Sequence, residues 1–222
     1  MGMSRPRVVL SAAATLDGKI ATRSGDSEIS SASDMTRMHS MRAGTDAILV
    51  GKNTMLRDDP LLTVRYAKGP NPVRVVLDPA GEIPPGSRIM KTCGEVPTII
   101  AVSSRISRAN QERLEGSAAE VIKAEGRVIP LRWLLGVLAT RGIRTILVEG
   151  GGTTNWEFVR EGLVDEVVLT VSPRMVGGAG GTTLVEGEGF ARMAEALPMR
   201  LVSAIRQGDE VVLRYEKAAD FG

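Results

Sequence analysis

Cysteine, histidine and aromatic side chains are scarce in this sequence of 222 residues, which has one Cys, one His, two Trp, two Tyr and three Phe. The single cysteine, Cys93, has no partner for an intrachain disulfide, which favours a reducing, cytoplasmic setting. One His and one Cys exclude zinc sites rich in either residue, and iron–sulfur clusters. So few aromatic side chains also argue against a base-stacking surface for nucleic acids.

An excess of charge and several catalytic motifs are missing as well. The formal net charge is only +2, which gives no electrostatic footprint for nucleic acid. The sequence contains no G-x-S-x-G, G-x-x-x-x-G-K-[ST] or G-x-G-x-x-G motif, and no zinc-deaminase signature. No metal site is predicted, so the remaining chemistry belongs to Lys, Asp, Glu, Ser, Arg and a bound cofactor.

Long apolar runs are absent too, and none reaches the roughly 18 residues needed to span a membrane. Arg5 and Arg7 precede the apolar run from Val8 to Leu16, as in the start of a signal peptide. The run is short and Asp17 follows it at once, so a buried first strand explains it better. We therefore expect a cytoplasmic protein without a membrane contact.

Apolar segments alternate between strand and helix patterns along the chain, which predicts parallel βαβ units in one domain over residues 1–222. The last two strands flank a Gln207-Gly208-Asp209 turn, which predicts a closing antiparallel hairpin. The predicted fold is α/β, with a mixed, mostly parallel sheet flanked by helices. The predicted strands are 7–14, 46–50, 73–77, 98–102, 120–123, 144–148, 165–171, 199–206 and 210–216; the predicted helices are 33–43, 107–115, 130–141 and 154–161.

The segment from Glu149 to Thr154, with sequence EGGGTT, follows a predicted strand and opens a predicted helix. Glycines allow a close backbone approach, and a helix N-terminus presents free N–H groups, so a pyrophosphate fits there. Glu149 ends its strand, where open α/β sheets bind ligands. A plain strand–turn–helix corner is the alternative, although three consecutive glycines are unusual for one.

Three other polar stretches each allow a functional and a structural interpretation. Asp17-Gly18 is a turn signal, and Lys19 after it is either functional or a solvated charge. Asp58 and Asp59, on a predicted loop, either bind magnesium or cap the loop, and neighbouring residues rarely face one ion. His39 has no second ligand, so we expect a partly exposed helix histidine beside Met residues that fill the core.

Together these stretches resemble the archaeal-type 2,5-diamino-6-(5-phosphoribosylamino)pyrimidin-4(3H)-one reductases of riboflavin biosynthesis, which have a dihydrofolate-reductase-like fold. The resemblance covers nearly the whole chain. The chain is also similar to the reductase part of the bacterial bifunctional deaminase–reductase. The stretches that carry the resemblance are TLDGKIA from Thr15, GDSEIS from Gly25, HSMRA from His39, VGKNT from Val50, DDPLLTVR from Asp58, PVRVVLD from Pro72, EGGG from Glu149, NW from Asn155, EGLVDE from Glu161 and GEGF from Gly187.

The resemblance implies reduction of the ribosyl group to ribityl by NADPH, with NADH possible, in a homodimer. It implies that Lys19 and Glu149 flank the reacting ribose; which of them, or a water, donates the proton stays open. Position by position it also implies substrate binding by Ser27, Arg42, Leu62, Arg65 and Glu149. The residues it implies for the cofactor are Ala13, Ala14, Thr54, Asp58, Gly150, Gly151, Gly152, Thr153, Thr154 and Asn155.

The sequence departs from the family after Asp78, where a Ser and then a basic residue are usual. Here Pro79, Ala80 and Glu82 follow, and a carboxylate would repel the 2′-phosphate of NADPH. Ser104 and Arg105, with Ser103, follow the next predicted strand and offer a substitute beside Pro79. These serines are alternatively the cap of the following helix, with Arg105 solvated.

Two other functions remain open at this point. One is a reductase of the same fold that acts on another pterin or pyrimidine, and the other is a non-catalytic nucleotide-binding module. The presence of Lys19, Asp58 and Glu149 together argues against the second.

Overall fold

A computed structural model describes residues 5–218. The chain folds into two compact units, and the division between them does not follow a linker. Unit 1 consists of residues 39–147 with Arg5 and Pro6, and unit 2 consists of residues 7–38 and 148–218. Each unit is therefore described by itself.

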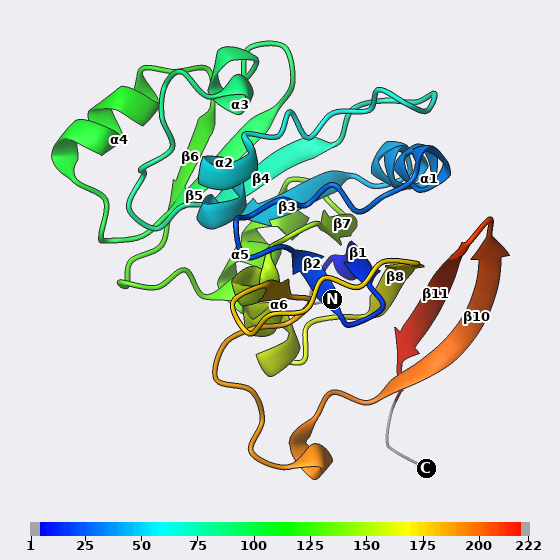
Figure 1. Cartoon of the computed structure of the whole chain (residues 1–222). Helices are drawn as coiled ribbons and strands as arrows, with labels where there is room; N and C mark the ends of the chain where they lie inside the picture. Colours follow the sequence, from blue (N-terminus) through cyan, green and yellow to red (C-terminus); the bar gives the residue numbers. More distant parts are fainter. Residues whose placement is uncertain (1–4, 219–222) are drawn as a thin grey trace. The chain divides into compact units, whose positions relative to one another are not determined.

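Parallel strands form the centre of unit 1 (Figure 1). The strand order is β7-β3-β4-β5-β6, and the pairs β3–β4, β4–β5 and β5–β6 are parallel. Every residue of β3 and β5 is buried, as expected for strands covered on both faces. The bounds are β3 Ala47–Gly51, β4 Val73–Leu77, β5 Thr98–Val102, β6 Glu120–Lys123 and β7 Thr145–Val148.

Helices connect these strands. Helix α5 (Leu131–Thr140) packs an apolar face into the core through Leu131, Leu134, Leu135 and Leu138, at the spacing of one helix side. Helix α4 (Arg108–Glu115) begins after Ser107, whose side chain accepts a hydrogen bond from the Asn110 N–H. The shorter helices are α2 (Lys52–Asp58) and α3 (Arg88–Lys91).

Arg74 is a fully buried cation in β4. Its guanidinium donates to the carbonyls of Leu61, Ile89 and Val96, at 3.2, 3.2 and 3.0 Å, and to the hydroxyls of Thr92 and Thr98. Burial lowers the pKa of Arg74. These five acceptors replace the water that the guanidinium loses on folding, and they attach the loop at Leu61, helix α3 and the chain before β5 to strand β4.

Unit 2 contains the mixed part of the sheet. Strand β1 (Arg7–Thr15) pairs in parallel with β8 (Glu166–Ser172), which pairs antiparallel with β11 (Glu210–Lys217). Strand β10 (Met199–Gln207) forms the predicted hairpin with β11. A separate two-stranded sheet joins β2 (Lys19–Ala21) to β9 (Thr182–Thr183). Helix α6 (Gly152–Arg160) and a short 3-10 helix (Met193–Glu195) complete this unit.

Helix α1 (Ala32–Ala43) begins after Ser31, whose hydroxyl accepts a hydrogen bond from the Asp34 N–H. Its buried side chains are the polar residues Asp34, His39 and Arg42, whereas Met35, Met38 and Met41 are only half-buried. The expectation that the Met side chains fill the core is therefore wrong. The helix instead buries hydrogen-bonding groups: Asp34 accepts from Arg37 at 2.8 Å and from Thr170 at 2.6 Å.

The predicted fold class is confirmed: a mixed, mostly parallel sheet with helices and a C-terminal antiparallel hairpin (Figure 1). All nine predicted strands are present, and each begins and ends within one residue of the predicted bounds. Helix α6 begins two residues earlier than predicted, and helix α2 lies where a loop was expected. No helix among residues 5–218 is long and apolar enough to cross a membrane.

Candidate active site

Three of the predicted substrate residues meet in unit 1. Arg42 on α1 donates to the Thr63 carbonyl at 3.0 Å, and Arg65 donates to the Thr63 hydroxyl at 3.0 Å. Leu62, between them, is buried and has a left-handed backbone with φ of 53°. This strained turn presents Thr63 to both guanidinium groups. The structure thus brings together Arg42, Leu62 and Arg65, three of the residues that the family resemblance implies for the substrate.

His39 lies at the centre of this group, and its expected partial exposure is wrong, because its side chain is 0% exposed. Its Nδ1 accepts a hydrogen bond from the Arg65 backbone N–H at 2.8 Å. Burial, followed by the positive charges of Arg42 and Arg65, lowers the pKa of His39 to about 4. The imidazole is therefore neutral at physiological pH.

Thr54 and Asp58 lie four residues apart on α2, where their side chains share one face of the helix. Asp59 ends this helix in a left-handed conformation and accepts a hydrogen bond from the Arg88 N–H at 2.9 Å. Asp59 therefore caps the next helix, which agrees with the capping alternative. Partial burial of the carboxyl raises the pKa of Asp58, although the residue as a whole is exposed. Within residues 5–218 no three His, Cys, Asp or Glu side chains gather as a metal site would require.

Pro79, Ser104 and Arg105 lie beside each other at the ends of β4 and β5. The Ser103 hydroxyl donates to the Pro79 carbonyl at 2.9 Å and accepts from the Arg105 N–H at 3.1 Å. Ser107 rather than Ser103 or Ser104 caps α4, so the helix-cap alternative for these two serines is wrong. Ser104 and Arg105 are exposed.

Glu82, expected to repel a phosphate, is paired with Lys52 at the start of α2. The hydrogen bond from Lys52 lowers the pKa of Glu82, and the charge of Arg105 lowers it further. Two cations therefore compensate the one carboxylate at this edge. Sequence reasoning missed Lys52, since 30 residues separate it from Glu82.

In unit 2 the predicted glycine turn precedes α6. Gly151 has a φ of 86°, which residues with a side chain rarely adopt. No side chain caps the helix. A Cβ on Gly152 would lie 2.7 Å from the Thr183 carbonyl, so only glycine allows this approach. The first turn contains no acidic residue, and its N–H groups suit the phosphates of a dinucleotide.

The segment from Gly181 to Glu186 contacts both Lys19 and the start of α6. Lys19 on β2 pairs with Thr183, and its Nζ donates to the Gly181 carbonyl at 3.3 Å. At the other side the Gly152 carbonyl accepts from the Glu186 N–H at 3.1 Å. The structure therefore brings Lys19 and the α6 N-terminus to one segment. Sequence reasoning had no signal for it beyond the preceding glycine-rich loop.

Asn155, the fourth residue of α6, is 2% exposed. Its Nδ2 donates to the Leu184 carbonyl at 2.7 Å, while its buried Oδ1 has no hydrogen-bond partner within residues 5–218. A Cβ at Gly150 would collide with this oxygen. Asn155 thus fixes the 181–186 segment against the helix. Thr153 is exposed and Thr154 is half-buried in the first turn.

The turn after β1 is held by Asp17. Its carboxylate accepts from the Thr15 hydroxyl at 2.7 Å and from the N–H groups of Val176 and Gly177, at 3.1 and 2.7 Å. These hydrogen bonds, that from Thr15 foremost, lower the pKa of Asp17 to about 2. Asp17 therefore joins two loops, and the turn reading of Asp17-Gly18 is confirmed by the Gly18 N–H to Thr15 carbonyl bond of 2.9 Å.

The remaining predicted residues of unit 2 lie on β1 and in loops. Ala13 and Ala14 pair with Thr170 and Val171 of β8, and Ala14 is buried. Glu149 follows β7 and is half-buried, and Ser27 is exposed in the loop before α1. Across residues 5–218 no hydrogen bond joins Ser27 to Lys19.

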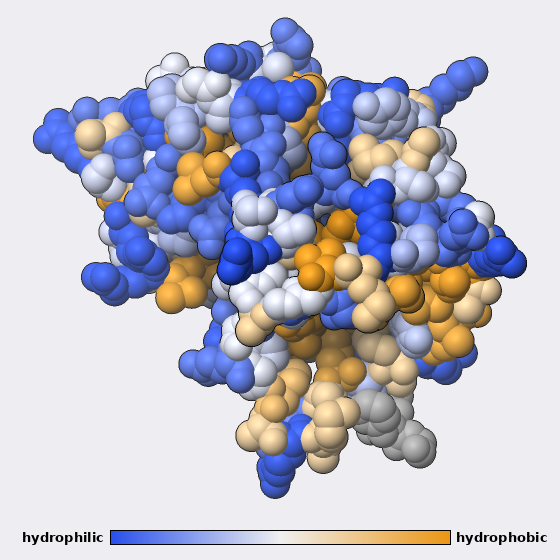
Figure 2. Space-filling model, in the orientation of Figure 1, coloured by the Kyte–Doolittle hydropathy of each residue, from blue (hydrophilic) through white to orange (hydrophobic). Residues whose placement is uncertain are grey.

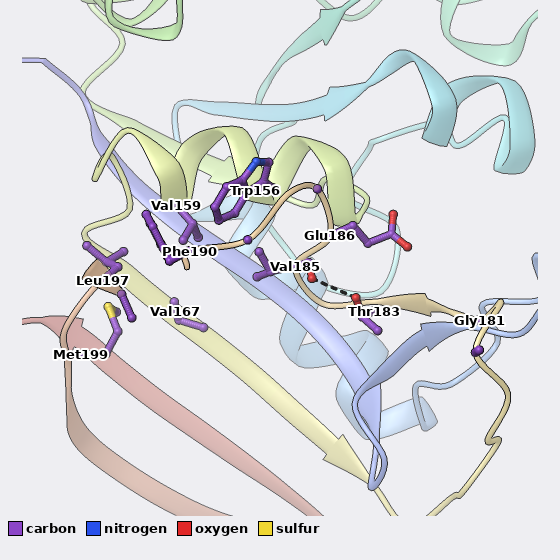
Figure 3. Close-up of a pocket in the computed structure, with 14 residues that line it drawn as sticks. Trp156, Val159, Val167, Gly181, Thr183, Val185, Glu186, Phe190, Leu197 and Met199 are labelled. Atoms are coloured by element: carbon purple, nitrogen blue, oxygen red, sulfur yellow. Dashed lines mark hydrogen bonds between the residues drawn. The ribbon is translucent and has the colours of Figure 1, made fainter. Parts of the chain in front are cut away.

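A pocket of about 650 Å³ lies beside α6 in unit 2 (Figure 3). Trp156 faces Phe190 at 5.0 Å between ring centroids, with the rings inclined by 66°. Val185, Leu197 and Met199 add apolar lining, while the Glu186 carboxylate points away from the apolar side chains. The sequence did not predict this pocket.

A family model described as the RibD C-terminal domain matches residues 6–213. The chain belongs to this family. Among its relatives is a protein named 2,5-diamino-6-ribosylamino-4(3H)-pyrimidinone 5′-phosphate reductase from Methanothermobacter thermautotrophicus, which is 44% identical over 95% of this chain and 98% of the relative. The predicted resemblance to riboflavin-biosynthesis reductases is thereby confirmed.

Solved structures agree with this RibD-family fold. One is a diaminohydroxyphosphoribosylaminopyrimidine deaminase/5-amino-6-(5-phosphoribosylamino)uracil reductase from Thermotoga maritima, 28% identical, with a TM-score of 0.79 over 96% of this chain and 57% of that one. A dihydrofolate reductase from Enterococcus faecalis, 11% identical, has a TM-score of 0.54 over 95% of this chain and 96% of that one. The second likeness concerns the fold alone, which is dihydrofolate-reductase-like.

Proposed function

We propose that this RibD-family chain reduces the ribosyl group of 2,5-diamino-6-(5-phosphoribosylamino)pyrimidin-4(3H)-one to the ribitylamino product, with NADPH as the reductant. The observation that carries the proposal is the similarity to a relative that is named as a ribosylaminopyrimidinone 5′-phosphate reductase. The match covers 98% of that relative's length. The cofactor supplies the hydride, so the chain's own residues bind, orient and move protons.

The first turn of α6 would hold the pyrophosphate, because uncapped N–H groups and a close glycine approach meet there. Thr54, Asp58, Pro79, Ser104 and Arg105 would contact the rest of the cofactor. Ala13 and Ala14 are small enough to admit the nicotinamide. The partnerless, buried Asn155 oxygen close to Gly150 supports a ligand-facing turn rather than a plain corner.

The substrate phosphate would bind to Arg42 and Arg65, with Ser27 as a further donor and Leu62 shaping the turn. Guanidinium groups suit phosphate because they donate in a planar fork. Lys19 and Glu149 would flank the ribose, where one of them or a water protonates the sugar. The Lys19 contact with the Gly181 carbonyl leaves two further donors on its ammonium.

The test is NADPH oxidation, followed by its absorbance, with the phosphoribosylaminopyrimidine as substrate and with the product identified by mass. We expect a mass gain of two hydrogens on the substrate. Dihydrofolate and the deaminated uracil analogue are the competing substrates, and a higher kcat/KM with either would contradict the proposal. Nucleotide binding without turnover on all three would instead favour a binding module.

We also propose that the chain acts in the cytoplasm as a homodimer that uses the β10–β11 hairpin. Strand β10 is the edge strand of its sheet, and Leu201, Val202 and Ile205 on it are 50%, 43% and 59% exposed. Figure 2 shows apolar side chains gathered on the surface where the hairpin lies. Such a surface is typical of an interface, and a second copy offers the same apolar strand.

Sedimentation at micromolar concentration tests the dimer. The wild-type chain should sediment at twice its monomer mass, and Ile205→Arg should sediment as a monomer, because the charge would be buried. Arg206→Glu, on the neighbouring exposed position, is the control and should keep the dimer. A monomeric wild-type chain would refute this arrangement.

A further inference from the structure

His39 has no role in the reaction proposed above, yet it touches both cations assigned to the substrate phosphate. It lies one helical turn before Arg42 on α1. Its Nδ1 accepts the Arg65 N–H at 2.8 Å, and its Nε2 lies 3.4 Å from the Arg42 Nη1. The ring is fully buried. A single side chain therefore links the helix to the loop that carries Arg65.

The hydrogen bonds of His39 fix its protonation. Because Nδ1 accepts a backbone N–H, it carries no proton, and the neutral ring carries its proton on Nε2. The lowered pKa, about 4, agrees with this assignment, since burial and the two arginines disfavour a third positive charge. A doubly protonated ring would lose the bond to Arg65.

The Nε2–H then faces a group that can only donate. Arg42 Nη1 donates to the Thr63 carbonyl at 3.0 Å, so it offers the imidazole no acceptor. Within residues 5–218 no acceptor lies within hydrogen-bond distance of Nε2. The Arg42 guanidinium is thus confined between the Thr63 carbonyl and the imidazole edge.

Tyr66 completes the group from the other side. Its ring meets the imidazole edge-on at 4.8 Å, and the Arg65 guanidinium lies 5.8 Å from the Tyr66 ring centre. The aromatic contacts restrict rotation of the imidazole and place the Arg65 side chain over a ring face. Both cations are therefore oriented by groups that contact His39.

We propose that His39 is a positioning residue for phosphate recognition, which acts by accepting the Arg65 backbone N–H and by packing against the Arg42 guanidinium, so that both arginines keep their binding geometry. The proposal rests on the proposed function, in which these two arginines bind the substrate phosphate. Its physical basis is preorganisation: free arginine side chains lose considerable rotamer freedom on binding, and a fixed pair does not.

Three substitutions separate the two nitrogens of the ring. His39→Asn keeps an acceptor near the Nδ1 position, His39→Gln places its amide near Nε2 only, and His39→Leu keeps neither. We expect His39→Leu and His39→Gln to raise KM for the phosphorylated substrate about tenfold, the equivalent of about 1.4 kcal/mol, with kcat within about threefold. His39→Asn should restore most of the affinity. Thr36→Ala, at an exposed position of the same helix, is the control and should leave KM unchanged.

The dephosphorylated substrate tells positioning from general stabilisation. Its kcat/KM should be equal in wild type and all His39 variants, because it lacks the phosphate that the arginines bind. An equal loss for both substrates, or a KM that changes with Thr36→Ala as much as with His39→Leu, would overturn the proposal. If His39→Leu fails to fold, the contrast between His39→Asn and His39→Gln decides in the same way.

Calorimetric titration with ribose 5-phosphate gives a readout that needs no turnover. Binding should weaken about tenfold in His39→Gln and little in His39→Asn. If the wild-type chain fails to reduce the pyrimidine but shows this pattern, the proposed function falls and the role of His39 stands. An active wild-type enzyme whose affinity for ribose 5-phosphate is the same in all variants refutes the role of His39 alone.

Discussion

The residues assigned to the substrate phosphate and those assigned to the cofactor are held in different ways. In unit 1, Arg42 and Arg65 are held by side-chain contacts with His39 and Thr63. In unit 2, the start of α6 is held by backbone contacts with residues 183–186, by the Asn155 side chain and by the absence of a Cβ. Substitution of many side chains should alter the first arrangement, whereas the second should be most sensitive at its glycines and at Asn155.

The largest expected effect concerns Glu149, the carboxylate beside the backbone-built turn. Glu149→Gln should lower turnover on the order of 10²-fold or more, because it removes the charged group that we propose flanks the reacting ribose. The melting temperature should hardly move, since an amide keeps the size of the side chain. Steady-state kinetics and a thermal melt measure the two. Near-normal turnover would remove Glu149 from the active site.

Acid should affect His39 in unit 1 and Asp17 in unit 2 at different pH values. The pKa of His39 falls from 6.5 to about 4 on folding, so the unfolded chain binds the proton first. The contribution of His39 to stability is complete above about pH 6.5 and is lost as pH falls toward 4, by about 2–3 kcal/mol. Asp17 has a pKa lowered from 3.8 to about 2, so its contribution is lost only between those values.

Urea unfolding at about pH 7, 5 and 4 checks this order, since those values bracket the His39 transition. The decrease between about pH 6.5 and 4 should shrink in His39→Asn, and Asp17→Asn should leave it unaltered. The same decrease in wild type and His39→Asn would mean that other groups cause it.

A Cβ at Gly152 should disturb the turn at the start of α6. It would lie 2.7 Å from the Thr183 carbonyl and 2.5 Å from the Glu186 Cγ, so Gly152→Ala should cost about 1–3 kcal/mol of stability and weaken NADPH binding. Gly136→Ala is the matched control, because nothing lies within 4 Å of its added Cβ in helix α5. It should stabilise the chain by about 0.5–1 kcal/mol. Equal effects of both substitutions would contradict the close approach.

The smallest expected effect concerns the 2′-phosphate. We expect NADPH to be preferred over NADH about tenfold, or about 1.4 kcal/mol, because Glu82 is already paired with Lys52 near Arg105. Arg105→Ala should remove the preference and leave the NADH reaction unchanged. A competition experiment between NADPH and NADH measures the preference. A thousandfold preference that survives Arg105→Ala would show that the phosphate binds elsewhere.

Much of the fold followed from local patterns, and the rest depended on contacts between distant residues. Strands such as β4 and β5 were predicted with their bounds because their apolar runs end at clear turn residues. Helix α2 was missed because Asn53 and Thr54 resemble loop residues, and its packing decides its conformation. The burial of α1 was predicted wrongly from its Met side chains, because the buried residues of that helix are polar groups with partners elsewhere in the chain.

The site followed the same division. Arg42, Leu62 and Arg65 were assigned to the substrate through the family's sequence motifs, and that assignment stays a prediction. The burial of His39 depends on Tyr66 and on the Arg65 backbone, which no spacing reveals. The pairing of Lys52 with Glu82 and the 181–186 segment are likewise products of the fold. Residue types predicted which chemistry is present, whereas its electrostatic setting came only from three-dimensional neighbours.

The buried guanidinium of Arg74 also has a consequence for the order of folding. The group cannot give up its water until the carbonyls of Leu61, Ile89 and Val96 are all in place. The segments that contain these carbonyls should therefore close in a single cooperative step, late, and open together in the native protein. Native-state hydrogen exchange would then report one shared opening free energy for the amides around residues 61, 89 and 96. The turn at Leu62, which we propose shapes the phosphate site, would keep its form for as long as that whole region stays closed.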